Sequence, residues 1–131
     1  MPLPYHPHPG EVLICDYDQI AVGAEMVKRR PVVVVSRREA SGGRLATVIP
    51  LSTTEPDPVR NWHHPMPHLR IKGWPDGATT WAKCDMLATV SFDRLNKPYV
   101  KTRSGRNYTT VMLDAQDLTA VRACVRSWLS L

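Results

Sequence analysis

The sequence has few cysteines, and their spacing excludes the cross-linked scaffolds that many small proteins use. Its 131 residues include three cysteines, an odd number, and no two of them form a C-x-x-C pair. A disulfide framework and a zinc knuckle are therefore not expected, and this cysteine usage is typical of a reducing cytosol. A chain of this length can bury a core without cross-links, so we expect one domain spanning residues 1–131.

Long apolar runs are also missing. No run approaches the roughly 20 residues of a membrane-spanning helix. The first ten residues contain four prolines and lack the apolar region of a secretory signal. We therefore expect a cytoplasmic protein with no membrane association.

Acidic residues are the third shortage. Against 17 Lys and Arg stand 12 Asp and Glu, which gives a formal net charge of +5 and a pI near 9.4. A basic excess of this size is only a weak indication of a polyanionic partner such as a nucleic acid, because many basic proteins bind none.

Short β-rich segments make up the first third of the chain. Residues 11–17 predict a strand, and so do the four valines at 32–35, which are too few and too β-branched for a helix. Residues 44–49 follow a Gly-Gly turn signal and predict another strand, which Pro50 is expected to end. The segments 32–35 and 44–49 together predict a hairpin.

The middle of the chain is rich in proline. Residues 53–77 hold five of the twelve prolines, and they predict long loops with short strands near 62–64 and 68–71. Residues 79–84 predict a further strand, and residues 92–95 predict a short helical turn. Two more segments, 99–102 and 107–111, flank a Ser-Gly pair and predict a second hairpin.

The end of the chain predicts a helix. Asp114 is a good N-cap, and Asp117 lies in the first turn, where the helix dipole favours a carboxylate. Apolar residues then recur at spacings of three and four: Leu118, Val121, Cys124, Val125, Trp128 and Leu129. We interpret this face as core packing rather than as a groove for a partner. Several short strands and one terminal helix predict a mainly β fold, a small barrel closed by a helix.

Three consecutive cations precede the four valines. Pro31 fixes its own φ and keeps Arg30 in an extended conformation. Because the valines anchor the strand, Arg30 presents a planar, permanently charged group on a stiff support, which suits bidentate contact with a phosphate. Lys28 and Arg29 would attract a polyanion to it. The alternative is that all three cations are merely solvated where the strand begins.

Hydroxyl groups follow the strand that is expected to pair with the valines. The outer ends of an antiparallel hairpin meet, so Arg30 and Ser52 should be neighbours. A hydroxyl beside a fixed guanidinium can hold a phosphodiester and the negative charge that develops on it. The alternative is that Ser52, Thr53 and Thr54 only cap a turn.

Seven short motifs occur in the same order as in the PemK/MazF toxins, and the chain resembles that family over most of residues 7–95. The motifs are P-x-P-G-E-V at 7–12, D-Y-D at 16–18, G-A-E at 23–25, R-R-P-V-V-V-V-S at 29–36, V-I-P-L-S-T-T at 48–54, W-A-K-C-D-M-L-A-T-V-S at 81–91 and F-D-R-L at 92–95. Each motif is weak alone, whereas their order and spacing together are specific. The terminal helix also fits the family.

The resemblance implies a fold and a function. The fold is the small SH3-like barrel of the MazF, PemK and CcdB toxins, assembled as a homodimer. The function is that of a bacterial toxin with a cognate antitoxin: a sequence-specific endoribonuclease that cuts single-stranded mRNA without a metal ion or cofactor. On physical grounds the antitoxin should be an acidic, partly disordered segment that orders as it covers the cations. The segment between Thr54 and Thr79 departs from the family, so no RNA sequence preference is transferred.

The resemblance also implies catalytic residues. Arg30 matches the family's arginine before the proline, Ser52 takes the place of its threonine or serine, and Glu25 matches its acidic residue. The implied reaction is attack of a 2′-hydroxyl on the adjacent phosphorus, which leaves a 2′,3′-cyclic phosphate and a 5′-hydroxyl. Arg30 would stabilise charge on the phosphorane and Ser52 would hold a non-bridging oxygen. Glu25 would be the base, unless it is a structural carboxylate paired with Arg29 or Lys28.

The histidines and tryptophans leave further alternatives. His63 or His64 could act as acid or base in place of Glu25, while Trp62 and Trp74 could stack on bases. The residues expected to contact RNA are Lys28, Arg29, Thr53, Thr54, Trp62, His63 and His64. A metal site is not expected, because no carboxylate or thiolate completes a ligand set with the histidines. Trp81 and Trp128 are expected to pack in the core.

Two other functions remain open. One is a toxin similar to CcdB, which inhibits DNA gyrase through a terminal Trp-Gly-Ile. This chain ends instead in Trp128-Leu129-Ser130-Leu131, with Trp128 on the apolar helix face, which weighs against that alternative. The other is a barrel that binds nucleic acid without cutting it.

Overall fold

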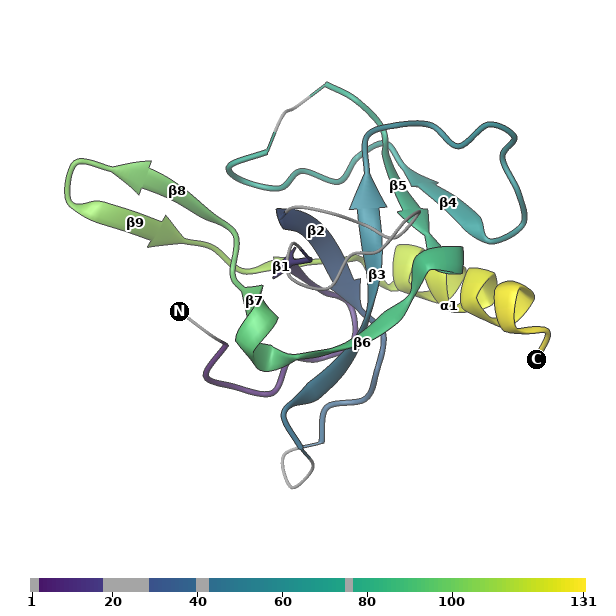
Figure 1. Ribbon diagram of the computed structural model, residues 1–131. Coiled ribbons are helices and arrows are strands. Elements are labelled where there is room, and N and C mark those ends of the chain that lie inside the picture. Colours follow the sequence, from purple (N-terminus) through teal and green to yellow (C-terminus); the bar gives the residue numbers. More distant parts are fainter. Residues whose placement is uncertain (1–2, 18–28, 40–42, 75–76) are drawn as a thin grey trace.

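Most of the regular elements in the described residues are strands, and a long helix follows them at the end of the chain (Figure 1). The computed structural model describes residues 3–17, 29–39, 43–74 and 77–131. The elements are β1 Glu11–Asp16, β2 Arg29–Val34, β3 Leu45–Ser52, β4 His63–Met66, β5 Thr80–Lys83, η1 Cys84–Met86, β6 Ala88–Ser91, η2 Phe92–Arg94, β7 Leu95–Asn96, β8 Tyr99–Thr102, β9 Gly105–Tyr108, β10 Val111–Met112 and α1 Ala115–Leu129. The mainly β class with one C-terminal helix agrees with the sequence-based prediction.

The central strand β2 is apolar on both faces because both faces are covered. Val32 and Val34 point into one core cluster, which also contains Phe92 of η2. Val33, on the opposite face, joins a second cluster with Val121 of α1. Alternate residues of a strand point to opposite faces, so an uninterrupted valine run supplies both clusters.

The strands pair in an open order. The main sheet runs β10-β1-β2-β3-β5-β4, with β6 beside β3 and β7 beside β1, while β8 and β9 form a separate hairpin. Within the described residues the two outer strands, β10 and β4, do not pair with each other. The expected hairpin of β2 and β3 is present, but closure of the sheet into a small SH3-like barrel is not confirmed.

Pro50 lies inside β3 rather than at its end, which corrects the sequence-based boundary. It pairs with Val32 of β2. On the other edge, β3 pairs with β6 up to Val48 and with β5 from Leu51 onward. Pro50 therefore lies where β3 changes its partner from β6 to β5. A proline is tolerated at this position because its missing N–H interrupts no pairing observed on that edge.

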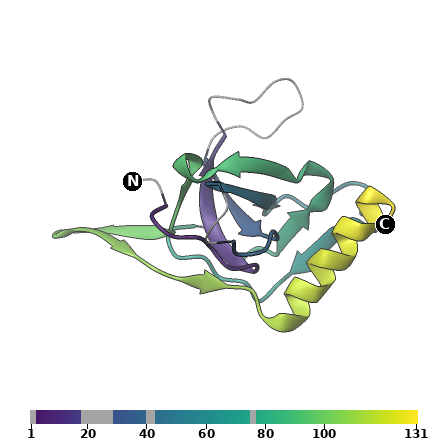
Figure 2. The ribbon, with the colours of Figure 1, turned by 90° about the horizontal axis from the view of Figure 1, so that it is seen from below.

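The proline-rich segment forms one strand instead of the two expected. β4 covers His63–Met66 and pairs with β5, but no strand forms over 68–71. The expected second hairpin is present as β8 and β9. Figure 2 shows this hairpin and α1 at opposite ends of the molecule.

The terminal helix begins as the sequence predicts. The Asp114 side chain accepts a hydrogen bond of 2.7 Å from the backbone N–H of Asp117. Val121 and Cys124 are buried on the apolar face. Trp128 packs against Trp62 but is 42% exposed, so the expectation that it packs in the core is met only in part.

No helix among the described residues combines the length and the apolarity that crossing a membrane requires.

Candidate phosphodiester site

Arg30 and Ser52 line one pocket at the end of the β2–β3 pair. Its volume is about 200 Å³, and its described lining residues are Arg30, Pro31, Leu51, Ser52, Thr53, Leu69, Ile71, Trp74 and Thr80. The structure therefore brings to one pocket the two residues that the geometry of an antiparallel hairpin predicts to be neighbours. Thr53, expected to contact RNA, also lines this pocket.

Strand register explains this arrangement. Val32 pairs with Pro50 in the antiparallel ladder of β2 and β3. The same register, continued by two residues, sets Arg30 level with Ser52. Residues directly opposite each other in an antiparallel pair have side chains on the same face. The buried Pro31, which pairs with Ile14 of β1, holds the backbone next to Arg30 in the sheet.

The Ser52 hydroxyl is oriented by its own turn. Its oxygen accepts a hydrogen bond of 3.1 Å from the backbone N–H of Thr54. A hydroxyl has one proton and two lone pairs, so this contact leaves the proton available for donation to an oxygen in the pocket. The expected turn-capping role and the expected phosphate-holding role are thus compatible. Thr54 itself is exposed and is not among the pocket's lining residues.

Apolar side chains form much of the pocket wall. Leu69, Ile71 and Trp74 come from the loop between β4 and β5. Ile71 is buried, whereas Leu69 and Trp74 are half-buried and pack against the second core cluster. An apolar wall lowers the local dielectric and strengthens the attraction between a guanidinium and an anion.

Sequence reasoning missed Thr80, Leu69 and Ile71 as lining residues. Thr80 is buried at the start of β5. The adjacent Trp81 pairs with Ser52, and this pairing brings Thr80 to the pocket. Trp81 is 8% exposed and packs in the core as expected.

The other cations of the basic stretch do not line this pocket. Arg29 points elsewhere and donates a hydrogen bond of 3.2 Å to the hydroxyl of Tyr99. Lys28 and the expected base Glu25 lie outside the described residues. The pocket's described lining residues supply a cation and hydroxyl groups, but neither a carboxylate nor an imidazole.

The two histidines lie near α1 and η1 instead. His64 Nε2 is 2.9 Å from a carboxylate oxygen of Asp117 at the start of α1. His63 Nδ1 accepts from the backbone N–H of Arg60 at 3.0 Å, and its Nε2 is 3.6 Å from a carboxylate oxygen of Asp85. The structure therefore does not bring either imidazole to Arg30.

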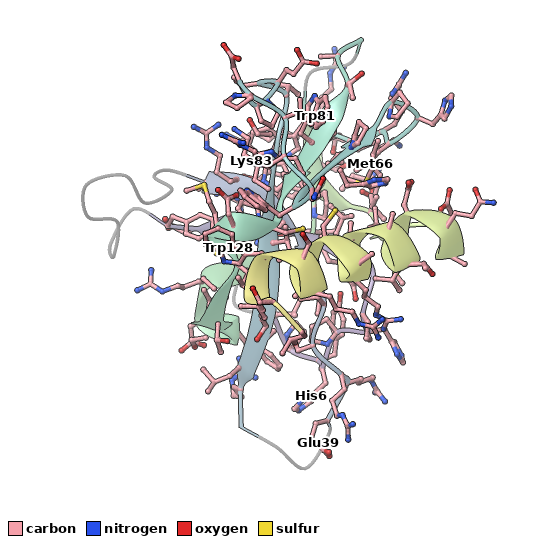
Figure 3. The ribbon with its side chains drawn as sticks, turned by 90° about the vertical axis from the view of Figure 1, so that its right-hand side faces the viewer. His6, Glu39, Met66, Trp81, Lys83 and Trp128 are labelled. Carbon is pink, nitrogen blue, oxygen red and sulfur yellow. The ribbon has the colours of Figure 1, made fainter. Side chains whose placement is uncertain are left out.

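Trp62 is engaged with the helix. Its ring lies 5.3 Å, centroid to centroid, from that of Trp128. Figure 3 shows Trp128 near the C-terminal end of α1, with Trp81, Lys83 and Met66 above the helix in this view and His6 and Glu39 below it. Trp62 is thus not a lining residue of the Arg30 pocket, whereas Trp74 is.

Metal ligands do not gather in the described part of the chain. No group of three or more His, Cys, Asp or Glu side chains is placed there to hold a metal ion. Cys15, Cys84 and Cys124 are buried as free thiols. Burial raises the pKa of Cys15 to about 11 and that of Cys84 to about 12, so neither thiol is a nucleophile at neutral pH.

Fold and pocket together define a small β-rich domain whose central hairpin ends in a cation, hydroxyl groups and an apolar wall. This set of groups suits a phosphodiester.

Comparison with known proteins identifies the family. The family described as PemK-like, MazF-like toxin of type II toxin-antitoxin system matches residues 8–129. The chain therefore belongs to this family of toxins. An uncharacterized protein of Haemophilus influenzae is 32% identical over an alignment that covers 74% of each chain.

Solved structures with similar folds include MazF toxins. MazF from Deinococcus radiodurans superposes with a TM-score of 0.68 at 21% identity, over 97% of this chain and 99% of that one. A mycobacterial endoribonuclease in complex with its cognate antitoxin gives 0.64 at 18% identity, over 95% and 96%. The Mycobacterium tuberculosis toxin MazF-mt6 gives 0.64 at 17% identity, over 92% and 97%. At these identities the likeness establishes the fold.

Proposed function

We propose that this toxin is a sequence-specific endoribonuclease that cuts single-stranded RNA without a metal ion. The observation that supports this proposal most directly is the joint placement of Arg30 and Ser52 in one pocket with an apolar wall. Membership of the toxin family supports it independently, and a structural neighbour is itself described as an endoribonuclease.

The proposed reaction is an internal transesterification of RNA. The 2′-oxygen attacks the adjacent phosphorus, the bond to the 5′-oxygen breaks, and the products carry a 2′,3′-cyclic phosphate and a 5′-hydroxyl. Negative charge builds on the non-bridging oxygens as the phosphorane forms. Arg30 neutralises that charge, and the Ser52 proton is donated to one of these oxygens. A single strand is the expected substrate, because A-form geometry conceals base edges in a deep, narrow groove.

Proton transfer requires a further group. Glu25 is proposed as the base that accepts the 2′-hydroxyl proton. Arg30 is proposed to donate a hydrogen bond to the leaving 5′-oxygen, which takes its proton from water. Lys28 is proposed to attract the RNA backbone. A homodimer and an acidic antitoxin that covers the cationic end of β2 complete the proposal, and the antitoxin bound to the mycobacterial neighbour is consistent with such a partner.

The direct test is cleavage of a long, unstructured RNA by the purified protein in the presence of EDTA. We expect discrete cuts at a recurrent short sequence, with products that end in a cyclic phosphate and begin with a 5′-hydroxyl. Arg30→Ala should lower the cleavage rate about 10²–10³-fold, the usual effect of removing one positioned electrostatic donor. Arg122→Ala, which removes an exposed arginine on α1, is the matched control and should cut normally.

Ser52 offers a second variant pair. Ser52→Ala should slow cleavage about tenfold or more, because a hydrogen bond to a charged group is lost. Ser52→Thr keeps the hydroxyl and should restore most of the rate. Normal cutting by Arg30→Ala would exclude the mechanism. Gyrase inhibition without RNA cleavage would favour the toxin type similar to CcdB, and RNA binding without cleavage would favour a non-catalytic domain.

A further inference from the structure

A second cavity lies beside the Arg30 pocket. Its volume is about 340 Å³, and its described lining residues are Ile14, Arg29, Gly73, Trp74, Tyr99, Val100 and Lys101. We call it the Trp74–Tyr99 cleft. Trp74 lines both cavities, and Arg29 and Arg30 are consecutive in β2. The cleft therefore continues the Arg30 pocket toward the hairpin of β8 and β9.

The aromatic walls of this cleft are held at a fixed separation. Trp74 belongs to the loop between β4 and β5, and Tyr99 begins β8. Gly73 packs so closely on the Tyr99 carbonyl that a Cβ at Gly73 would lie 2.5 Å from its oxygen. Backbone-to-backbone packing of this kind makes the spacing of the two aromatic residues a property of the fold.

The Tyr99 ring is also fixed by cations. Arg29 donates to its hydroxyl at 3.2 Å, and the Arg106 guanidinium lies 4.4 Å from its ring centroid. The Arg29 hydrogen bond lowers the pKa of the Tyr99 hydroxyl, and the charges of Arg106 and Lys101 act in the same direction. The potential around the ring is therefore positive.

The ligand chemistry follows from these walls. Aromatic rings accept a flat, unsaturated group, while Arg29 and Lys101 favour an anion. Within the described lining no carboxylate opposes them. Proteins that bind single-stranded nucleic acid combine aromatic stacking with a cationic groove along the backbone. A neighbouring pocket suited to a phosphodiester makes a nucleotide of the same strand the best occupant.

We propose that the Trp74–Tyr99 cleft binds one base of the RNA strand next to the cleaved phosphodiester, while Lys101 and Arg29 contact the phosphate beside that base. The proposal deepens the endoribonuclease function and rests on it for the identity of the strand. Tyr99 and Trp74 act here as binding residues that hold the strand in line with Arg30.

The test measures binding apart from cleavage. An oligonucleotide that spans a mapped cut receives a single 2′-deoxy nucleotide at that position, which prevents attack, and its Kd is measured by fluorescence anisotropy. If the wild-type protein makes no cut, an unstructured mixed-sequence oligonucleotide of equal length replaces it. Tyr99→Ala and Trp74→Ala should each raise the Kd about tenfold, whereas Tyr99→Phe and Trp74→Phe keep a ring and should stay within about twofold of wild type.

Abasic substitution locates the bound base. One abasic position next to the cut should weaken wild-type binding about tenfold or more, and it should weaken Tyr99→Ala binding by a smaller factor, because only Trp74 then remains to stack on the base. Lys101→Ala should reduce the slope of log Kd against log salt concentration by about 0.7, the value for one phosphate contact to a single strand. Arg122→Ala should leave that slope unchanged.

The outcomes separate the two proposals. If the wild type cuts RNA but no abasic position has an effect that depends on Tyr99, the endoribonuclease proposal stands and the proposed base site in the cleft is wrong. If an abasic effect depends on Tyr99 but no RNA is cut, the cleft is an RNA-binding site and the endoribonuclease proposal is wrong. An acidic peptide that binds tightly and depends on Tyr99, with no coupling to RNA, overturns the cleft as a base site. Thermal unfolding of Tyr99→Phe and Tyr99→Ala checks that both variants remain folded.

Discussion

Pro31 shows how a single residue prepares the site. Its ring fixes φ and excludes helical conformations for the residue before it. Arg30 is therefore held in an extended backbone, paired with Cys15 of β1, and its long side chain departs from a defined point. A lysine-rich loop would give the same charge without the same position, because the ammonium group ends a flexible stem.

Gly73 has a similar role at the Trp74–Tyr99 cleft. Its φ of +86° is in a region that L residues rarely adopt, and an added Cβ would meet the Tyr99 carbonyl oxygen. Gly73→Ala should therefore combine backbone strain with a backbone clash, lowering the free energy of unfolding by more than the roughly 1–2 kcal/mol of left-handed strain alone. Urea denaturation at neutral pH measures this loss.

Gly77 provides the matched control for that substitution. Its φ is +91°, but no atom lies within 4 Å of an added Cβ. Gly77→Ala should therefore lower the free energy of unfolding only by the backbone strain, without the added cost of a clash. Equal losses in the two variants would mean that the contact between Gly73 and Tyr99 gives way at little cost, and that the two aromatic residues are not rigidly spaced.

Among the elements, those with a strong local pattern could be predicted from sequence. The α1 face follows from the helical spacing of Val121 and Cys124, and the N-cap follows from Asp114. The hairpins follow from valine and turn-residue patterns, and the 3-10 turn at Phe92 was also correctly placed. These signals are local, because each depends on residues only a few positions apart.

Elements that depend on distant contacts could not be predicted. Pro50 was expected to end β3, but the change of partner from β6 to β5 makes it acceptable inside the strand. Residues 68–71 have strand-like composition, yet the loop there instead provides Leu69 and Ile71 to the pocket wall. Such outcomes depend on packing between segments, which composition does not encode.

The N-cap of α1 contributes to the free energy of unfolding by an amount that can be measured. Asp114 satisfies the Asp117 N–H, one of the donors that the first turn of a helix leaves without a partner. Asp114→Ala should lower the free energy of unfolding by about 1 kcal/mol, measured by urea denaturation. Asp93→Ala is the control, because Asp93 is also an exposed aspartate but forms only a surface ion pair of 3.4 Å with Arg44. This substitution should lower the free energy of unfolding by less than about 1 kcal/mol. A larger loss for Asp93 would contradict this ranking.

For the whole molecule, the site lies at the end of the strand that separates the two apolar clusters. The clusters on the two faces of β2 include Val32 and Val33 respectively, and Arg30 occupies the same strand just before them. The sequence could predict that Arg30 and Ser52 meet, because hairpin register is a local rule. It could not predict that the β4–β5 loop forms the apolar wall of the pocket, or that His63 and His64 lie away from the pocket. Both outcomes depend on the order in which distant strands pair in the sheet.

The buried thiols predict how the whole molecule responds to alkaline pH. Burial raises the pKa of Cys15 to about 11 and that of Cys84 to about 12, from 9.0, and burial also raises the pKa values of Tyr5 and Tyr17. Between pH 9 and 11 the unfolded chain loses thiol protons that the folded chain keeps. The unfolded state then binds fewer protons, so the free energy of unfolding falls as pH rises, while below pH 9 these thiols contribute no slope.

Urea denaturation at intervals from pH 7 to pH 11 measures this fall. Each thiol should account for a loss on the order of 2 kcal/mol by pH 11. Cys15→Ala creates a cavity and should lower stability at every pH, but its decline above pH 9 should be shallower than that of the wild type, because one proton-binding difference is gone. Parallel curves would show that the Cys15 thiol is reached by solvent and titrates normally, and that the cluster around it is less tightly closed than its complete burial indicates.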